Sequence, residues 1–294
     1  MILVVGGTGQ LGGLIARRLL AEGRPVRILA RAGSAWQPLE AAGAQVAIGD
    51  LKARATLDEA CKGTDVVITT ANSARRGGAD NIETVDTDGN RHLVDAARQS
   101  GVKQFIFVSA AGVTVDSPVP FLKAKAQTEA YLRGSGLSYT ILAPDVFMDV
   151  WIPMVLGPAL RGDPVTLIGE GRRKHSFIAV PDVAAFAIAA IGHADAMNRH
   201  LPLGGPDAVS WRDVIGAFER RLGRAIPVVT LAPGQALPGL PDSTAQLMAG
   251  LETYDSIIPM TETARVFGVM PTSLAQFVHA MLAKAGGPAV AGQP

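Results

Sequence analysis

Short apolar runs alternate with stretches of helical periodicity through the first half of the chain. The apolar runs are residues 2–5, 26–30, 45–48, 66–70, 104–109 and 139–143. Nearly continuous apolar runs of this length are typical of parallel strands that are buried on both faces. Between them, helical patterns lie near residues 10–22, 35–42, 56–61, 81–100 and 120–134. Alternating strands and helices with right-handed crossovers predict an α/β fold built on a doubly wound parallel sheet.

The pattern changes after Pro144. Prolines then recur at short intervals and are expected to break the chain into short elements. Residues 176–180 are expected to form one more strand, followed by a helix at 183–192 that Asp182 caps, so that about 176–192 returns to the sheet. Further helices are expected near residues 210–222, 243–253, 261–267 and 272–285.

The first apolar run ends in a glycine-rich turn that opens directly into a helical pattern. The turn reads Gly6-Gly7-Thr8-Gly9-Gln10-Leu11-Gly12 and fits both G-x-G-x-x-G and G-x-x-G-x-x-G. The glycines permit a tight turn, a close approach of a pyrophosphate to the backbone, and close packing of the helix on the strand. An ordinary glycine-rich βα turn is the alternative, but the strand before it and the helix after it favour a Rossmann-type dinucleotide site.

These observations predict the organisation of the chain. Residues 1–150 are expected to form an NAD(P)-binding Rossmann domain, and residues 151–294 a smaller, mostly helical substrate-binding region. Residues 286–294 are rich in glycine, alanine and proline and are expected to be a disordered tail.

The end of the second apolar run predicts which nucleotide binds. An NAD-preferring site normally carries an acidic residue there for the ribose 2′-hydroxyl, whereas this chain has Arg31. A guanidinium there pairs with a 2′-phosphate through charge-assisted hydrogen bonds, and the Ser34 hydroxyl adds a further donor. A solvated arginine in a loop is the alternative. NADP(H) is therefore the expected cofactor.

Other cofactor contacts are expected after the third and fourth apolar runs. Asp50 and Leu51 stand where an adenine would lie, and Asp50 either accepts from the adenine amino group or caps the next helix. Ala71 and Asn72 end the fourth run with a small residue, which leaves room for the ribose and pyrophosphate of the cofactor.

Composition narrows the class of protein. The chain is 48% hydrophobic and 18% charged, with a net charge of +1 and no basic run, so neither nucleic acid nor an anionic membrane surface is an expected partner. Cys61 is the only cysteine, which excludes an internal disulfide and a cysteine metal cluster, and no metal site is expected. The apolar stretch 150–160 is too short for a membrane span. A cytoplasmic protein with a small-molecule substrate is expected, either a monomer or a homodimer.

The motifs together resemble one family. They are the glycine-rich turn, Arg31, Gly49-Asp50-Leu51, Gly101-Val102-Lys103-Gln104-Phe105-Ile106-Phe107-Val108-Ser109, the segment 135–144 and Gly204-Gly205-Pro206. In this combination the chain resembles the atypical short-chain dehydrogenase/reductases, in particular the NmrA-like branch with its isoflavone-reductase-like and quinone-reductase-like members. The likeness spans about residues 2–280 and implies the fold and cofactor class. The branch includes reductases, redox-sensing regulators and assembly factors, so it leaves the substrate open.

The chain departs from this family at one catalytic position. Members that reduce carbonyls place a Tyr four residues before a Lys on one helix, and the Tyr delivers the proton. Here Lys125 falls on the Lys position, and Phe121 stands in place of the Tyr. The resemblance to isoflavone-reductase-like members implies that Lys125 works without the Tyr, binding the nicotinamide ribose and moving a proton. A solvated lysine is the alternative, as Lys123 stands nearby.

Ser109 matches the serine of the family and is expected to hydrogen-bond a substrate oxygen. The alternative is a strand-end hydroxyl that caps the following turn. After the sixth run, where the family lines its substrate pocket, stand Asp145, Phe147, Met148, Trp151 and Met154, and His175 ends a short basic cluster. Aromatic and methionine side chains suit a planar apolar substrate, although such residues are more often part of a core.

Two functions follow from this reading. The first is an NADPH-dependent reductase of a small planar acceptor such as a quinone, an enone or a related aromatic carbonyl. Quinones and enones fit the missing Tyr because hydride transfer to them gives a delocalised anion that water can protonate. The second is a non-catalytic NADP(H)-sensing regulator or assembly factor of the NmrA-like type.

Overall fold

The computed structural model describes residues 1–74, 76–237 and 242–284, and the chain divides into two compact units. Unit 1 consists of Met1–Pro144, Val180–Leu203 and Arg265–Val269. Unit 2 consists of Asp145–Ala179, Gly204–Ala264 and the chain from Met270 onward. Each unit is thus built from separate stretches. The division into residues 1–150 and 151–294 stays a prediction, and the tail predicted at 286–294 lies outside the described residues.

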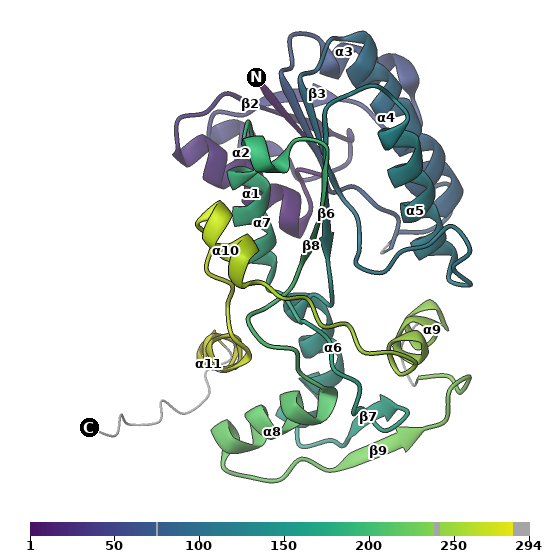
Figure 1. Ribbon diagram of the computed structural model, residues 1–294, viewed down its shortest axis with the longest axis vertical. Helices are drawn as coiled ribbons and strands as arrows, with labels where there is room; N and C mark the ends of the chain where they lie inside the picture. The colour runs from purple at the N-terminus through teal and green to yellow at the C-terminus, as the bar shows by residue number, and fades with distance from the viewer. Residues whose placement is uncertain (75, 238–241, 285–294) are drawn as a thin grey trace. The chain divides into compact units, whose positions relative to one another are not determined.

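Unit 1 is built on a seven-stranded parallel sheet in the order β3-β2-β1-β4-β5-β6-β8 (Figure 1). Its strands are β1 (Ile2–Val5), β2 (Val26–Ala30), β3 (Gln45–Ile48), β4 (Val66–Thr69), β5 (Gln104–Val108), β6 (Tyr139–Pro144) and β8 (Arg199–Leu203). β1 lies inside the sheet: Val4 pairs with Ile28 of β2 on one side and with Ile68 of β4 on the other. The doubly wound parallel sheet predicted from the apolar runs is confirmed.

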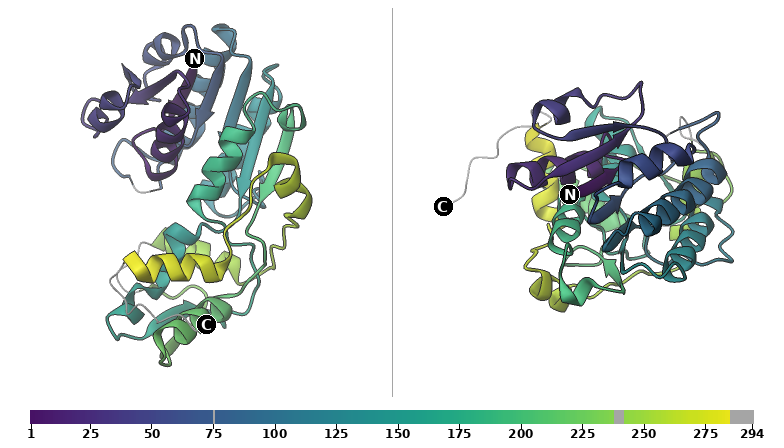
Figure 2. Two further views of the ribbon diagram at one scale, coloured as in Figure 1. Left: turned by 90° about the vertical axis from the view of Figure 1, so that its left-hand side faces the viewer. Right: turned by 90° about the horizontal axis from the view of Figure 1, so that it is seen from above.

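The helices of unit 1 cover both faces of this sheet (Figures 1 and 2). On one face α1 (Gln10–Ala21) contacts α7 (Val180–Ala189). On the other lie α3 (Arg54–Cys61), α4 (Asp88–Gln99) and α5 (Pro120–Arg133). The shorter elements are α2 (Gln37–Ala41), the π-helix η1 (Ile82–Thr87) and the 3-10 helix η2 (Ala194–Ala196). Buried sheet residues such as Leu3, Phe105 and Phe107 pack with Leu57 of α3 and Leu93 of α4 in one apolar core.

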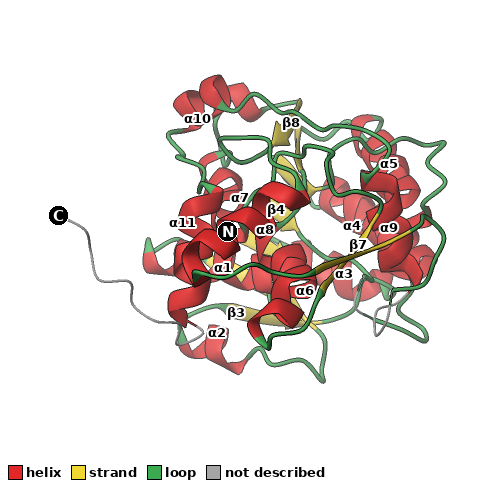
Figure 3. Cartoon of the chain, turned by 90° about the horizontal axis from the view of Figure 1, so that it is seen from below, coloured by secondary structure: helices red, strands yellow, loops and turns green. Residues whose placement is uncertain are grey.

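Unit 2 has a two-stranded parallel sheet of β7 (Val165–Ile168) and β9 (Val228–Leu231), both labelled in Figure 1. Figure 3 shows β7 from below. Its helices are α6 (Met148–Leu160), α8 (Trp211–Leu222), α9 (Asp242–Leu251) and α11 (Leu274–Lys284), while α10 (Thr261–Phe267) passes from unit 2 into unit 1. α8 begins at a capping box in which the Ser210 hydroxyl accepts from the Asp213 N–H. The core of unit 2 includes Ile152, Leu167 and Phe218.

The strand predicted at residues 176–180 is wrong. His175 and Ile178 form only isolated bridges, and α7 begins at Val180. Phe177 and Ile178 are instead buried in unit 2 as irregular chain. The strand that completes the sheet is β8, which begins with the exposed polar residues Arg199 and His200 and contains Pro202. In the described sheet β8 is the last strand and pairs only with β6, so it needs no continuous apolar run.

The expectation of short pieces after Pro144 is also wrong at α6, which is continuous although Pro153 and Pro158 lie inside it. A proline within a helix removes a backbone hydrogen bond and crowds the preceding turn. α6 offsets this by burying side chains on successive turns, among them Ile152, Val155 and Leu156. Among the described residues, every helix is too short or too polar to cross a membrane.

The single thiol of the chain is expected to be unreactive in the folded protein. Cys61 is fully buried at the end of α3, and burial, with a smaller effect of Asp58, raises the pKa of its thiol to about 12. At about pH 8 almost no thiolate is present, and thiolate is the reactive form. A thiol-reactive disulfide reagent should label none of the native protein and one thiol per chain in denaturant. Rapid labelling of the native protein would contradict this environment.

Candidate functional site

The glycine turn after β1 leaves no room for larger side chains. Gly6 has φ +84°, and its carbonyl oxygen accepts the Gly9 N–H at 2.9 Å. A Cβ on Gly12 would lie 2.4 Å from that same oxygen, and a Cβ on Gly6 would lie 2.6 Å from Thr70 Oγ1. Both distances are shorter than the van der Waals contacts that Cβ atoms make in proteins. The turn, the first turn of α1 and the end of β4 therefore pack backbone against backbone, as the fingerprint requires.

The amino end of α1 is uncapped. Gly9 is the N-cap and provides no side-chain hydrogen bond, and the first turn of α1 contains no acidic residue. The first N–H groups of a helix have no intrahelical acceptor, and the positive end of the helix dipole lies there. The side chains of Thr8 and Gln10 are exposed at this end. These features fit a pyrophosphate group.

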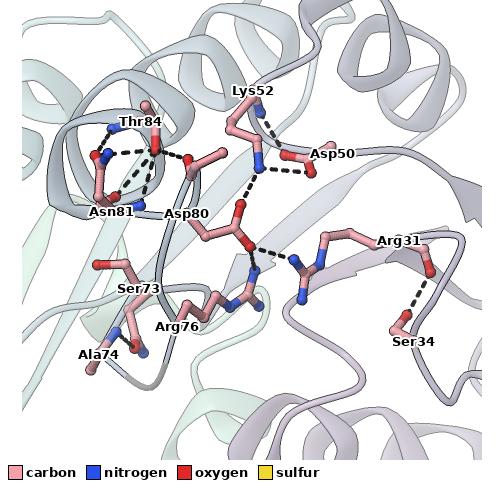
Figure 4. Close-up of polar contacts among 12 residues, drawn as sticks. Arg31, Ser34, Asp50, Lys52, Ser73, Ala74, Arg76, Asp80, Asn81 and Thr84 are labelled. Carbon is pink, nitrogen blue, oxygen red and sulfur yellow. Dashed lines mark hydrogen bonds and ion pairs between the residues drawn. The ribbon is translucent and has the colours of Figure 1, made fainter.

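Arg31, directly after β2, takes part in a cluster of charges (Figure 4). Its guanidinium pairs with the carboxylate of Asp80, which also pairs with Lys52 Nζ and lies 3.4 Å from Arg76 Nη1. Lys52 Nζ also lies 3.1 Å from a carboxylate oxygen of Asp50. The cations, Lys52 foremost, lower the pKa of Asp80. Arg31, Lys52, Arg76 and Asp80 are called the Asp80 cluster below.

Ser34 and Asp50 lie beside this cluster but have local partners. The Ser34 hydroxyl donates to the Arg31 carbonyl oxygen at 2.7 Å. Asp50 Oδ1 accepts the backbone N–H of Lys52 at 2.9 Å. Each contact stabilises the turn after its strand. The expectation that these two side chains contact the cofactor stays a prediction.

The remaining predicted cofactor residues are near the same ends of the strands. Leu51 and Ala71 are buried and belong to the apolar core of unit 1. Asn72 Oδ1 accepts the Ala74 N–H at 3.0 Å, which shapes the chain after β4. Since parallel strands end at one edge of their sheet, β1 to β4 bring the glycine turn, Arg31, Asp50 and Asn72 to a common edge.

Lys125 is buried on α5 against the end of β5. Lys125 is 4% exposed, and its Nζ donates to the Val108 carbonyl oxygen at 2.9 Å. Nζ also lies 4.8 Å from the centre of the Phe107 ring and 5.6 Å from that of Phe121. Burial lowers the pKa of Lys125, while the more distant charges of Asp86 and Glu129 oppose that shift. The alternative of a solvated lysine is thus wrong.

Ser109 lies just beyond β5, one residue past the carbonyl that Lys125 binds. It is 5% exposed, and its Oγ makes no hydrogen bond of ordinary geometry among the described residues, although the carboxylate of Glu129 lies close enough for the hydroxyl to interact with it. Its backbone N–H donates to the Leu142 carbonyl oxygen at 2.8 Å, which fixes the main chain. A ligand atom would give this buried hydroxyl a better partner.

Two buried carboxylates on the same side of the sheet were missed from the sequence. Glu129, one helical turn after Lys125, has Oε2 2.8 Å from Arg133 Nη2 and Oε1 3.6 Å from His200 Nε2. Asp86 of η1 accepts the Ser73 N–H at 3.0 Å, and burial raises its pKa. The spacing of Glu129 from Lys125 was available in the sequence, whereas the position of Asp86 depends on the packing of η1.

The substrate residues predicted after β6 lie in unit 2, where two of them are close together. Asp145 accepts the Ser176 N–H at 2.8 Å, and burial raises its pKa, while the neighbouring His175 opposes that shift. His175 is 1% exposed, and its Nε2 lies 2.9 Å from the Leu251 carbonyl oxygen. The Tyr254 ring, not identified from the sequence, packs edge-on against His175 at 5.5 Å.

The apolar substrate residues are placed differently. Met148 is 1% exposed and forms part of the core of unit 2. Trp151 is partly buried against that core, and Phe147 and Met154 are half-buried. Met148 is thus a packing residue, whereas the other three retain some exposed surface. Contact of these residues with a substrate stays a prediction.

Comparison with known proteins decides the family. A family described as NAD(P)H-binding matches residues 6–194, which include the glycine turn, the Asp80 cluster, Ser109 and Lys125. The chain belongs to the NAD(P)H-binding family. The family resemblance drawn from the motifs is confirmed, and so is a nicotinamide dinucleotide as the cofactor class.

Relatives of this NAD(P)H-binding protein are named for different roles. It is 30% identical to an NAD(P)H azoreductase of Xenophilus azovorans, over 97% of this chain and 99% of the relative. It is 32% identical to the photosystem II assembly factor Ycf39 of a Synechocystis species, over 76% of this chain and 68% of the relative. Its fold is similar to that of the Escherichia coli quinone oxidoreductase QOR2 complexed with NADPH, with a TM-score of 0.82, 24% identity, and coverage of 96% and 100%.

The described residues of this NAD(P)H-binding protein fit the cofactor and hold no metal cluster. The close-packed glycines and the uncapped end of α1 suit a pyrophosphate, and the Asp80 cluster provides cations beyond β2 and β3. Among the described residues no group of three or more His, Cys, Asp or Glu could hold a metal ion. Lys52 follows Gly49-Asp50-Leu51 directly and was visible in the sequence, whereas Asp80 carried no such signal.

Proposed function

We propose that this protein is an NADPH-dependent reductase that transfers hydride to a small planar acceptor such as a quinone, an enone or a related aromatic carbonyl. The observation that carries the proposal is the buried Lys125 at the end of β5, with Phe121 in place of a Tyr. A lysine that was merely exposed to solvent on the helix surface would not be buried. The near full-length likeness to an NAD(P)H azoreductase supports a reductase and adds azo compounds to the acceptors worth testing.

The cofactor is assigned to the edge of the sheet in unit 1. The backbone from Gly6 to Gly12 and the amino end of α1 would hold the pyrophosphate. Arg31 would pair with the 2′-phosphate, which favours NADPH over NADH. Asp50 and Leu51 would lie at the adenine, and Ala71 and Asn72 would leave room for the ribose and pyrophosphate. When bound, the reduced nicotinamide supplies the hydride.

Lys125 and Ser109 are assigned the catalytic roles. Lys125 would exchange its bond to the Val108 carbonyl for the ribose hydroxyls of the cofactor and hold the nicotinamide ring in place. The Ser109 hydroxyl, which lacks a well-formed hydrogen bond, would donate to the acceptor oxygen. Phe121 has no proton to give, so acceptors whose reduced form is a delocalised anion suit the site best. For the acceptor we assign the unit 2 residues Asp145, Phe147, Trp151, Met154 and His175, while Met148 supports them from the core.

A non-catalytic NADP(H)-sensing regulator or assembly factor is the second candidate. Two observations favour it: the phenol is absent at position 121, and the chain is 32% identical to a photosystem II assembly factor. A regulator of this kind would bind the cofactor tightly, discriminate between its oxidised and reduced forms, and show no turnover.

NADPH oxidation in the presence of quinones, enones, azo compounds and aldehydes should reveal turnover with one of the first three classes. The protein is first shown to bind NADPH by fluorescence titration, which keeps binding separate from chemistry. NADH is the matched control and should support slower turnover, because it lacks the phosphate that Arg31 would bind. Tight NADPH binding with no turnover on any acceptor would contradict the reductase and favour the second candidate.

A further inference from the structure

The Asp80 cluster holds one carboxylate among three cations (Figure 4). The Asp80 side chain is 12% exposed, whereas those of Arg31, Lys52 and Arg76 are 44%, 31% and 30% exposed. The cations therefore remain accessible from solvent while the carboxylate lies between them. An anion from outside would meet the same three groups that Asp80 already uses.

The order of the strands explains how Asp80 reaches these cations. Arg31 follows β2 and Lys52 follows β3, but Asp80 lies beyond β4, and β1 stands between β4 and β2. The chain from β4 must therefore cross the carboxyl end of β1, where the glycine turn lies, to place Asp80 beside Arg31. Asp80 thus extends into the part of the edge assigned to the cofactor.

The segment that carries Asp80 has two glycines before it and a capped helix after it, and the Asp80 N–H donates to the Gly77 carbonyl oxygen at 3.2 Å. Gly77 and Gly78 precede it, and a Cβ on either would meet no atom within 4 Å. Asn81 follows it and is fixed by a capping box with Thr84, in which Asn81 Oδ1 accepts the Thr84 N–H at 3.0 Å. Hydrogen bonds thus hold the backbone on both sides, and the Asp80 carboxylate can leave the cations by rotation of its own side chain, without loss of the start of η1.

A 2′-phosphate can pair with the three cations as the Asp80 carboxylate does in this structure. It carries more negative charge than a carboxylate and has three acceptor oxygens. A 2′-hydroxyl has no charge, so it cannot replace Asp80, although the carboxylate could accept a hydrogen bond from it as acidic residues do in NAD-binding sites. Exchange of one anion for another keeps the three cations paired.

We propose that Asp80 competes with the 2′-phosphate of NADPH for Arg31, Lys52 and Arg76, and thereby sets the difference in affinity between NADPH and NADH. The inference rests on the assignment of Arg31 to the 2′-phosphate made above, and it adds Asp80 as the residue that weakens that contact. Removing the negative charge at position 80 therefore strengthens binding of ligands with the phosphate.

Calorimetric titration with 2′,5′-ADP and with ADP tests this without any need for turnover. Asp80→Asn should bind 2′,5′-ADP about five- to thirtyfold more tightly than the wild type, as expected from two or three partly exposed ion pairs. Its affinity for ADP should change less than about twofold. Asp80→Ser is a second test of the same charge. Asp58→Asn is the matched control, because Asp58 also pairs with an arginine, Arg54, at 2.8 Å on α3; it should change neither affinity.

Unchanged or weaker binding of 2′,5′-ADP by both Asp80 variants would overturn the proposal and show that Asp80 orients the cations instead. Equal tightening for ADP would also overturn it, since the effect would not depend on the phosphate. Absence of 2′,5′-ADP binding in the wild type and all variants would remove the assignment of Arg31 and this inference with it. None of these results bears on turnover, so the reductase proposal is judged separately.

Discussion

Lys125→Ala is expected to lower kcat of the reductase by about 10²- to 10⁴-fold, the range typical of removing a group that takes part in proton transfer or positions the reacting atoms. The reason is the position of the ammonium group, which is buried at the end of β5 and bonded to the Val108 carbonyl. Steady-state NADPH oxidation measures the loss. The dissociation constant of NADPH should rise less than about tenfold, because the glycine turn and Arg31 remain to hold the cofactor.

Lys123→Ala is the matched control, as Lys123 is exposed on the same helix. It should keep the wild-type kcat. Lys125→Met keeps most of the side-chain volume and removes the buried charge, so it should fold as well as the wild type and lose turnover like Lys125→Ala. Normal turnover in a well-folded Lys125→Met protein would remove Lys125 from the catalytic assignment.

Gly12→Ala is expected to abolish cofactor binding and to lower the free energy of unfolding by about 1–3 kcal/mol, the usual cost of forcing extra volume into a packed site. The new Cβ would lie 2.4 Å from the Gly6 carbonyl oxygen and 2.8 Å from Thr70 Oγ1. A backbone atom cannot move aside as a flexible side chain can, so α1 must shift away from the turn. Denaturant unfolding and NADPH titration measure the two effects.

Gly250→Ala is the control for helix propensity. Gly250 lies in α9, and a Cβ there would meet nothing within 4 Å. Alanine is the better helix former by about 1 kcal/mol, so this variant should be more stable than the wild type. If Gly12→Ala were equally stabilised and still bound NADPH, the close packing of the glycine turn would have no role in the site.

The sheet could be predicted from the sequence wherever a strand is buried on both faces. Such strands require apolar side chains at nearly every position, which is why β1, β2, β4, β5 and β6 could be found from the sequence. β3, at the other edge, was also predicted, although none of its residues is buried. β8 has one neighbour and a proline, so its pattern carries little signal. The apolar run at 176–180 was wrongly predicted as a strand. Buried residues need apolar side chains both in irregular chain and in a strand, so the sequence pattern is the same.

The candidate site was predictable where its parts are close in sequence. The glycine turn is fixed by a spacing within one strand–turn–helix unit, and Arg31 by its place at the end of β2. Asp80 could not be predicted, because its contact with Arg31 follows from the strand order rather than from any local pattern. The burial of Lys125 likewise depends on how α5 packs on β5, and Lys123 two residues away is exposed.

The discontinuous make-up of the two units has a consequence for biosynthesis. The chain passes from one unit to the other after Pro144, Ala179, Leu203, Ala264 and Val269. A ribosome therefore releases most of the parallel sheet long before Phe267, which packs on Phe186 and His193, has been made. At about 5–20 residues per second, synthesis of the chain from Pro144 to Val269, the last residue of unit 1, takes roughly 6–25 s. For about the first 3–12 s of that interval, until β8 has been made at Leu203, β6 is an open edge that could pair with another chain.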